Sequence, residues 1–141
     1  MNLSVAGEAA RAVLSLNVPL ILIPYDAATG ILISGANLDL LVGQGPAMAH
    51  VSRAALGWLG FWNDDVGLPG FYPFDWIAAA YLLHPDLFNC AKTRAKIARE
   101  WTFWLLPHQA LLVGDDRLSG AVVTYCPQTA TTLHDLLIAQ P

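Results

Sequence analysis

The segment GEAARAVLSLNVPLILIPY, residues 7–25, decides the fold, because its apolar pattern changes from helical to strand-like within a few residues. Residues 7–16 carry apolar side chains at helical spacing, with Glu8 and Arg11 on the other face. Residues 18–25 form a continuous apolar run whose length and β-branched residues favour a buried strand. A helix followed directly by a buried strand is typical of layered α/β folds.

The rest of the chain continues this alternation. Apolar spacing predicts a short strand over 31–34, helices over 37–42, 46–62, 75–83 and 129–139, and strands over 101–106, 110–113 and 121–125. The turn at residues 114–117 predicts that the last two strands form a hairpin, and we interpret the basic stretch 91–100 as solvated. The expected fold is a single domain over residues 1–141, an α/β fold in layers. Helices flank a mostly parallel sheet, with a C-terminal β-hairpin.

The composition is unusually apolar and poor in charge. The chain has 141 residues, with seven Lys and Arg against eleven Asp and Glu, which gives a net charge of −4. Charged residues make up 13%, against about 25% in an ordinary domain, and mean hydropathy is +0.47. These values exclude intrinsic disorder and argue against nucleic-acid binding. So few charges to cover a surface predict an oligomer formed through an apolar face, or a piece of a longer protein.

No segment has the sequence of a membrane span. The best apolar run, residues 12–25, is 14 residues long and is interrupted by Asn17, Pro19 and Pro24. A span needs roughly 20 consecutive apolar residues. The N-terminus also lacks the basic and apolar regions of a signal peptide. We therefore expect a cytoplasmic protein without a membrane partner.

Several groups of reactive residue types carry little functional signal. The Asp64–Asp65 pair lies in an expected loop, where a solvated role is favoured over metal binding. We interpret Cys90 and Cys126 as small buried hydrophobic residues rather than a disulfide framework. The histidines share no zinc-ligand spacing and are His50, His84, His108 and His134.

Asp75 stands out because it begins an expected apolar helix, in the stretch FYPFDWIAAAY. One interpretation is an N-cap, in which the carboxylate accepts hydrogen bonds from the first helix amides. The other is a ligand for a hard cation, which would need further oxygen ligands from elsewhere in the protein. Spacing alone leaves both interpretations open.

The stretch FDWIAAAYLLHPDLF, residues 74–88, resembles the C-terminal signature of the inosine–uridine-preferring nucleoside hydrolase family. In that family a His-Asp pair opens a helix of the pattern D-x-x-A-x-x-x-x-x-x-P, which Asp75, Ala78 and Pro85 fit. Segments 8–10, 18–34, 37–41 and 114–121 resemble other parts of the family in the same order. The resemblance therefore runs over nearly the whole chain.

This resemblance implies a Rossmann-like, nucleoside hydrolase-like fold and hydrolysis of the N-glycosidic bond of ribonucleosides, with a calcium-bound water as nucleophile. It implies that Asp75 is a Ca²⁺ ligand and that Asn2 contacts the ribose of the substrate. The family histidine proposed to protonate the leaving base is Phe74 here. Phenylalanine has no proton to donate, so Phe74 is expected to stack on the base or to pack.

The family's first metal motif, Asp-x-Asp-x-x-x-Asp-Asp, does not occur in these residues. Since Ca²⁺ takes six to eight oxygen ligands, Asp75 alone cannot form its site. We therefore expect the C-terminal half of a nucleoside hydrolase, which is inactive until a missing N-terminal half supplies the remaining ligands. The alternatives are a non-catalytic homo-oligomer with a structural or binding role, and an unrelated α/β domain with chance similarity.

Overall fold

The structure is a computed structural model that describes residues 2–16, 18–102 and 106–138. Contacts within the chain divide it into two compact units. Unit 1 comprises residues 1–22 and 90–126, and unit 2 comprises residues 23–89 and 127–141. The prediction of a single domain stays a prediction, and each unit is described by itself.

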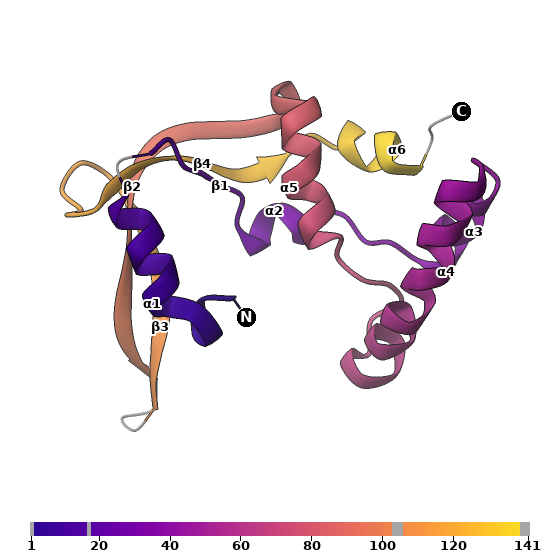
Figure 1. Cartoon of the computed structure of the whole chain (residues 1–141), viewed down its shortest axis with the longest axis horizontal. Coiled ribbons are helices and arrows are strands. Elements are labelled where there is room, and N and C mark those ends of the chain that lie inside the picture. Colours follow the sequence, from indigo (N-terminus) through magenta and orange to yellow (C-terminus); the bar gives the residue numbers. More distant parts are fainter. Residues whose placement is uncertain (1, 17, 103–105, 139–141) are drawn as a thin grey trace. The chain divides into compact units, whose positions relative to one another are not determined.

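The described residues form a mixed α/β fold, which confirms the predicted class (Figure 1). The helices are α1 (Asn2–Ser15), α2 (Tyr25–Thr29), α3 (Gly35–Val42), α4 (Pro46–Phe61), α5 (Phe74–Leu83) and α6 (Thr132–Ile138). Short π-helical and 3-10 segments follow α4 and α5, namely η1 (Trp62–Val66) and η2 (Pro85–Leu87). The strands are β1 (Ile21–Leu22), β2 (Phe88–Thr102), β3 (Leu106–Gly114) and β4 (Ala121–Thr129).

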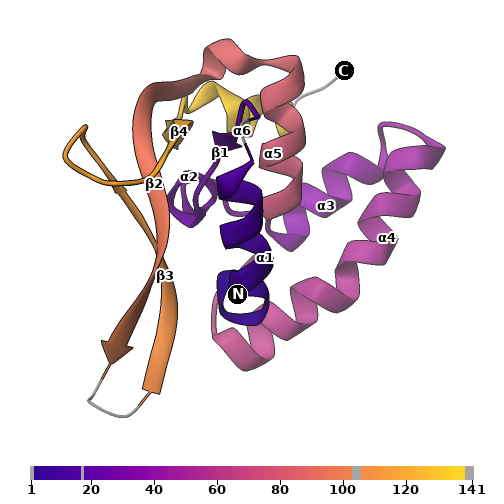
Figure 2. The same ribbon diagram turned by 60° about the vertical axis from the view of Figure 1, so that its left-hand side comes forward.

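The strands form one mixed sheet in the order β1-β4-β2-β3. β1 is parallel to β4, and β2 is antiparallel to β3 in a register that runs from Arg94↔Gly114 to Thr102↔Leu106. Figure 2 shows β2 and β3 as a long two-stranded ribbon. The predicted hairpin of residues 110–113 with 121–125 is wrong, because β3 and β4 lie on opposite sides of β2.

β2 is the central element of unit 1, although its residues 91–100 were expected to be solvated. Ala95 and Ile97 are 0% and 8% exposed, whereas the cations at alternate positions lie on the other face of the strand. Because apolar and charged side chains alternate with period two, one face of the strand enters the core while the other meets water. Because positive charges are concentrated in residues 91–100, this stretch was predicted to be solvated and its alternating apolar positions were not recognised as a strand.

Helix α1 packs on β3, on the face of the sheet to which Ile97 of β2 also belongs. Arg11 Nη2 donates a hydrogen bond to Gln109 Oε1 at 3.3 Å, and Gly7 lies so close to the Gln109 side chain that a Cβ there would collide with it. Gln109 pairs with Arg99 in the β2–β3 register, two positions from the buried Ile97. An ion pair of 2.6 Å joins Arg11 to Glu8, and its hydrogen bond and charge lower the pKa of the Glu8 carboxyl.

The buried strand predicted over residues 18–25 is wrong in length and in burial. β1 has two residues, and its Ile21 side chain is 45% exposed. The physical reason is the pair of prolines that flank β1. Pro19 and Pro24 have no backbone N–H, so they confine the ladder with β4 to the residues between them.

Cys90 on β2 and Cys126 on β4 form a disulfide, with an S–S distance of 2.06 Å. The interpretation of both residues as free hydrophobic thiols is therefore wrong. The neighbouring strands bring the two Cα atoms within 4.1 Å of each other, although 36 positions separate them in the sequence. Pairing over such a separation depends on the strand order, which the sequence analysis did not predict.

Unit 2 packs the remaining helices around a core of aliphatic side chains. Ser34 caps α3 in a reciprocal capping box with Asn37, and the long helix α4 packs against α3 (Figure 1). The strand predicted over 31–34 is reduced to one bridge between Ile33 and Phe71. The buried core residues include Ile31, Ile33, Leu38, Leu41, Ile77 and Leu133.

In the described part of the chain, no helix has the length and apolar character needed to cross a membrane.

Reducing the disulfide is expected to destabilise unit 1. Breaking it frees a segment of 36 positions, for which the loop-entropy relation gives a loss of about 4 kcal/mol. Urea denaturation with and without a phosphine reductant measures this loss. The Cys90→Ser/Cys126→Ser variant is the control and must not respond to the reductant. Equal midpoints for the oxidised and reduced protein would contradict the expectation.

Gly120 is expected to tolerate no side chain, because a Cβ there would meet the backbone carbonyl of Ala95 on β2. Gly120→Ala should therefore cost about 1–3 kcal/mol in the free energy of unfolding. Gly60 in α4 is the matched control, since a Cβ there meets nothing within 4 Å. Gly60→Ala should stabilise by about 0.5–1 kcal/mol in the same denaturation experiment. Equal effects of both substitutions would refute the close approach of Gly120, the residue before β4, to Ala95 of β2.

Candidate functional site

Four aromatic rings of unit 2 meet at the beginning of α5, and we call Tyr25, Trp62, Tyr72 and Phe74 the aromatic cluster. Tyr25 and Phe74 stack, with centroids 5.5 Å apart and planes at 29°. Tyr72 lies edge-on to Trp62 at 5.2 Å and contacts both members of the stacked pair at 6.0 and 6.1 Å. Such pairs add roughly 0.5–1.5 kcal/mol each beyond the area they bury.

The backbone before α5 positions this cluster. Ile33 and Phe71 exchange two backbone hydrogen bonds, of 2.9 and 3.0 Å. Gly70 makes the approach possible, since a Cβ at that position would lie 2.5 Å from the Ile33 carbonyl oxygen. The segment that follows leads directly into Tyr72 and Phe74, so the bridge fixes where α5 begins.

The stacked pair joins the starts of two helices that carry the same dipeptide pattern. α2 opens with Tyr25-Asp26 and α5 opens with Phe74-Asp75. Each aromatic residue is the first of its helix, and each aspartate lies in the first turn, where the helix dipole favours a negative charge. Contacts between α2 and α5 accompany the ring stacking.

The cluster is buried on one side and open on the other. Trp62 is 8% exposed, and its Nε1 has no hydrogen-bond partner among the described residues. Tyr25 is 60% exposed and Phe74 is half-buried. An aromatic surface that is buried on one side and exposed on the other offers a planar ligand a stacking platform. Asp26 and Asp75 follow its two stacked rings in the sequence.

Asp75 is exposed, and the described residues give it no hydrogen bond or ion pair. The N-cap of α5 is Pro73, and no side chain caps the helix. The interpretation of Asp75 as the N-cap is therefore wrong, because the helix begins one residue earlier than the spacing predicted. The carboxylate is left unengaged in the first turn.

The described residues do not fit a complete calcium site. They contain no group of three or more His, Cys, Asp or Glu side chains placed to hold a metal ion. Ca²⁺ requires six to eight oxygens, and Asp75 offers at most two.

The predicted site residues fall in different parts of the chain. Phe74 and Asp75 lie together at the start of α5, whereas Asn2 begins α1 in unit 1 and its side chain lies outside the described residues. Their predicted roles stay predictions.

Three members of the cluster were not predicted as site residues, namely Tyr25, Trp62 and Tyr72. For Tyr25 the available signal was the repeat of an aromatic residue between proline and aspartate, in Pro24-Tyr25-Asp26 and Pro73-Phe74-Asp75. This repeat does not include Trp62 or Tyr72. Comparison of the chain with protein-family models and with curated proteins finds no match.

The two neighbours at the start of α5 are expected to differ sharply in their contribution to stability. Phe74→Ala removes ring contacts with three aromatic neighbours and should cost about 2–4 kcal/mol. Asp75→Asn removes only a favourable interaction with the helix dipole and should cost at most about 1 kcal/mol. Thermal unfolding of both variants measures the difference. A loss for Asp75→Asn as large as for Phe74→Ala would reveal a structural partner of this carboxylate.

Proposed function

We propose that this chain supplies the nucleoside-binding part of an N-ribohydrolase, an enzyme that hydrolyses the bond between a ribose and its base. The observation that carries the proposal is the half-open Tyr25–Phe74 stack, with the unengaged carboxylate of Asp75 on the residue that follows Phe74. It occurs in the stretch whose sequence resembles the nucleoside hydrolase signature. A layered, Rossmann-like arrangement of the complete enzyme belongs to the same proposal.

The binding chemistry follows from the exposed groups. A nucleobase stacked on an aromatic side chain gains about 1–3 kcal/mol, and Tyr25 is sufficiently exposed to offer part of its ring. Carboxylates accept hydrogen bonds only, so Asp75 is suited to the hydroxyl groups of a ribose. The two groups together match the apolar and polar ends of a nucleoside.

The same groups limit which part of the reaction this chain performs. Cleavage of a glycosidic bond passes through a state with positive charge on the sugar, which a nearby carboxylate such as Asp75 stabilises. Phe74 has no ionisable group, so the departing base must obtain its proton from another donor. We therefore assign Phe74 to binding and not to proton transfer.

The expectation of a calcium site rests on the resemblance to the family and not on the residues that the structure describes. Because one carboxylate does not make a Ca²⁺ site, the proposal assigns the other ligands and the water-activating carboxylate to additional polypeptide. The isolated chain should then bind nucleosides without hydrolysing them.

A non-catalytic binding role is the second candidate. It is favoured by large apolar side chains that stay exposed on the helices of unit 2, which include Val51, Trp58, Phe61, Leu82 and Leu83. The cytoplasmic location stays a prediction. The Cys90–Cys126 disulfide argues against it, since disulfides persist mainly in oxidising compartments.

Nucleoside binding is tested by saturation-transfer NMR with inosine and with uridine as ligands. We expect saturation transfer from the wild-type protein to the base protons of the nucleoside, and a loss of at least about fivefold in affinity in Tyr25→Ala, because the exposed stacking ring is removed. Phe61→Ala is the matched control, since its exposed ring stacks on Trp58 and lies outside the aromatic cluster.

Two results would contradict the proposal. One is the absence of transfer to either nucleoside, and the other is equal binding by Tyr25→Ala and the wild type. The isolated chain should release no free base from either nucleoside, with or without calcium. Liquid chromatography of the reaction mixture measures this release. Turnover by this chain alone would show that no additional polypeptide is needed for catalysis.

A further inference from the structure

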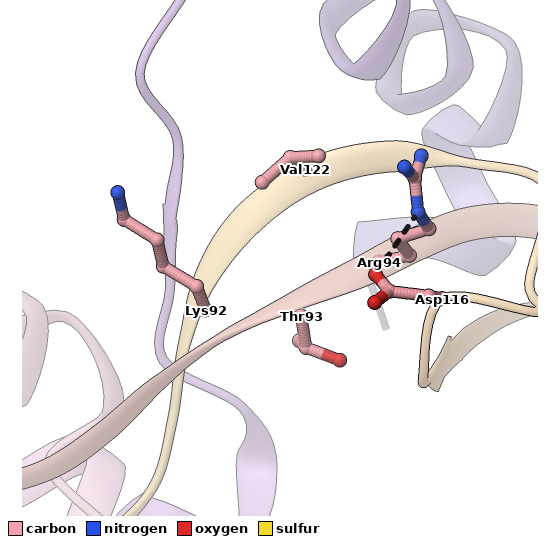
Figure 3. Close-up of a pocket in the computed structure, with 5 residues that line it drawn as sticks. All are labelled: Lys92, Thr93, Arg94, Asp116 and Val122. Atoms are coloured by element: carbon pink, nitrogen blue, oxygen red, sulfur yellow. Dashed lines mark ion pairs between the residues drawn. The ribbon is translucent and has the colours of Figure 1, made fainter.

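The face of the unit 1 sheet that α1 leaves uncovered carries a row of cations. Lys92, Arg94 and Lys96 occupy alternate positions of β2 and therefore lie on one face of the strand. The Cα atoms of successive cations in this row are about 7 Å apart. Figure 3 shows the Lys92 and Arg94 side chains on one side of β2 and Thr93 on the other.

Two exposed apolar side chains share this face. Val122 of β4 is 58% exposed and lines a small hollow of about 70 Å³ together with Lys92, Thr93, Arg94 and Asp116. Ile21 is 45% exposed and pairs with Thr124, which lies on the same side of β4 as Val122. We call these five residues the basic sheet face: Ile21, Lys92, Arg94, Lys96 and Val122.

The cations of this face are incompletely neutralised. Arg94 Nη1 donates to the Gly120 carbonyl at 3.1 Å, and its Nε lies 3.6 Å from a carboxylate oxygen of the fully exposed Asp116. Within residues 2–16, 18–102 and 106–138, Lys92 and Lys96 have no ion pair. Two ammonium groups and two apolar side chains therefore face solvent together.

The charge of the chain is divided unevenly between its units. Unit 1 has six Lys and Arg against four Asp and Glu, a net of +2, and unit 2 has one against seven, a net of −6. All seven acidic residues of unit 2 are exposed aspartates: Asp26, Asp39, Asp64, Asp65, Asp75, Asp86 and Asp135. The chain thus carries a surface of each sign.

Among these aspartates, Asp64 and Asp65 lie where negative charge is least favourable. They follow the C-terminus of α4, whose carbonyl groups are already negative, and the last turn of α4 has no basic residue. The nearby Trp58 and Phe61 rings stack at 5.2 Å and are each 44% exposed. With Val66, which is 45% exposed, these residues form what we call the acidic end of α4.

We propose that the basic sheet face of one copy of this chain docks onto the acidic end of α4 of a second copy. The positive charge of Lys92 and Lys96 attracts the adjacent carboxylates of Asp64 and Asp65, while the aliphatic and aromatic side chains of the two surfaces pack together and exclude water from the charged groups. A second copy is the fitting partner because each surface combines exposed apolar groups with the charge that the other lacks. The contact is heterologous, since it joins two different surfaces.

Sedimentation velocity over a range of protein concentrations, at 50 mM and at 1 M NaCl, tests this contact. At low salt the mean mass should rise with concentration, and at 1 M salt the association should weaken at least tenfold, because the Debye length falls to about 3 Å. Lys92→Glu/Lys96→Glu and Asp64→Lys/Asp65→Lys should each abolish association. An equimolar mixture of the two variants should associate again, which also shows that both are folded.

Asp86→Lys/Asp135→Lys is the control, since it makes the same charge change outside both surfaces and should associate like the wild type. Tyr25→Ala should also associate like the wild type, which separates this contact from nucleoside binding. A single-chain mass at every concentration would overturn the proposal, as would association that survives Lys92→Glu/Lys96→Glu. Failure of the mixed variants to associate, or association only with another protein, would overturn it too.

Discussion

The backbone pairing of β2 on both of its edges is the constraint on which unit 1 depends. β3 lies on one side of this strand and β4 on the other, and β4 in turn carries the short strand β1. The positions of β3 and β4 therefore depend directly on pairing with this strand of 15 residues, and the position of β1 depends on it through β4. The alternation of buried Ala95 and Ile97 with cations fixes which face of β2 is turned inward, because a shift by one residue would bury the charges.

Unit 2 depends in the same way on ring contacts. The Tyr25–Phe74 stack ties the start of α2 to the start of α5, and the Ile33–Phe71 bridge holds the segment that leads to it. The aromatic cluster is therefore both a packing element and the most ligand-like surface of this unit. Its two aspartates, Asp26 and Asp75, follow from the same local pattern at each helix start.

Sequence reasoning predicted the helices best, because helical spacing is a local property. Helices α3, α4 and α5 begin and end within two residues of their predicted bounds. The strand order could not be obtained in this way, since it depends on pairings between distant segments. The Cys90–Cys126 disulfide and the hairpin of β2 with β3 are the clearest examples.

The candidate site was predictable only in part, for a related reason. Phe74 and Asp75 were found because they are adjacent and belong to a recognisable stretch. Tyr25 and Trp62 come from two other segments, and only the folded chain brings their rings within 6.3 Å of Phe74, whereas Tyr72 lies two residues before it. A single aromatic residue in a sequence is more often part of a core, so the sequence did not indicate that any of the three belongs to a site.

The place of β3 at the end of the strand order has a consequence for handling the protein. Its nine residues pair with β2 on one side, and no strand of the described chain covers the other side. Proline and charged side chains normally protect such an edge from pairing with another chain. In this strand Pro107 removes one backbone donor, but the run Ala110–Val113 carries no charge that would repel a neighbour. Partly unfolded molecules would therefore be most vulnerable to cross-β aggregation along this strand, and a lysine introduced into the run is the simplest protection.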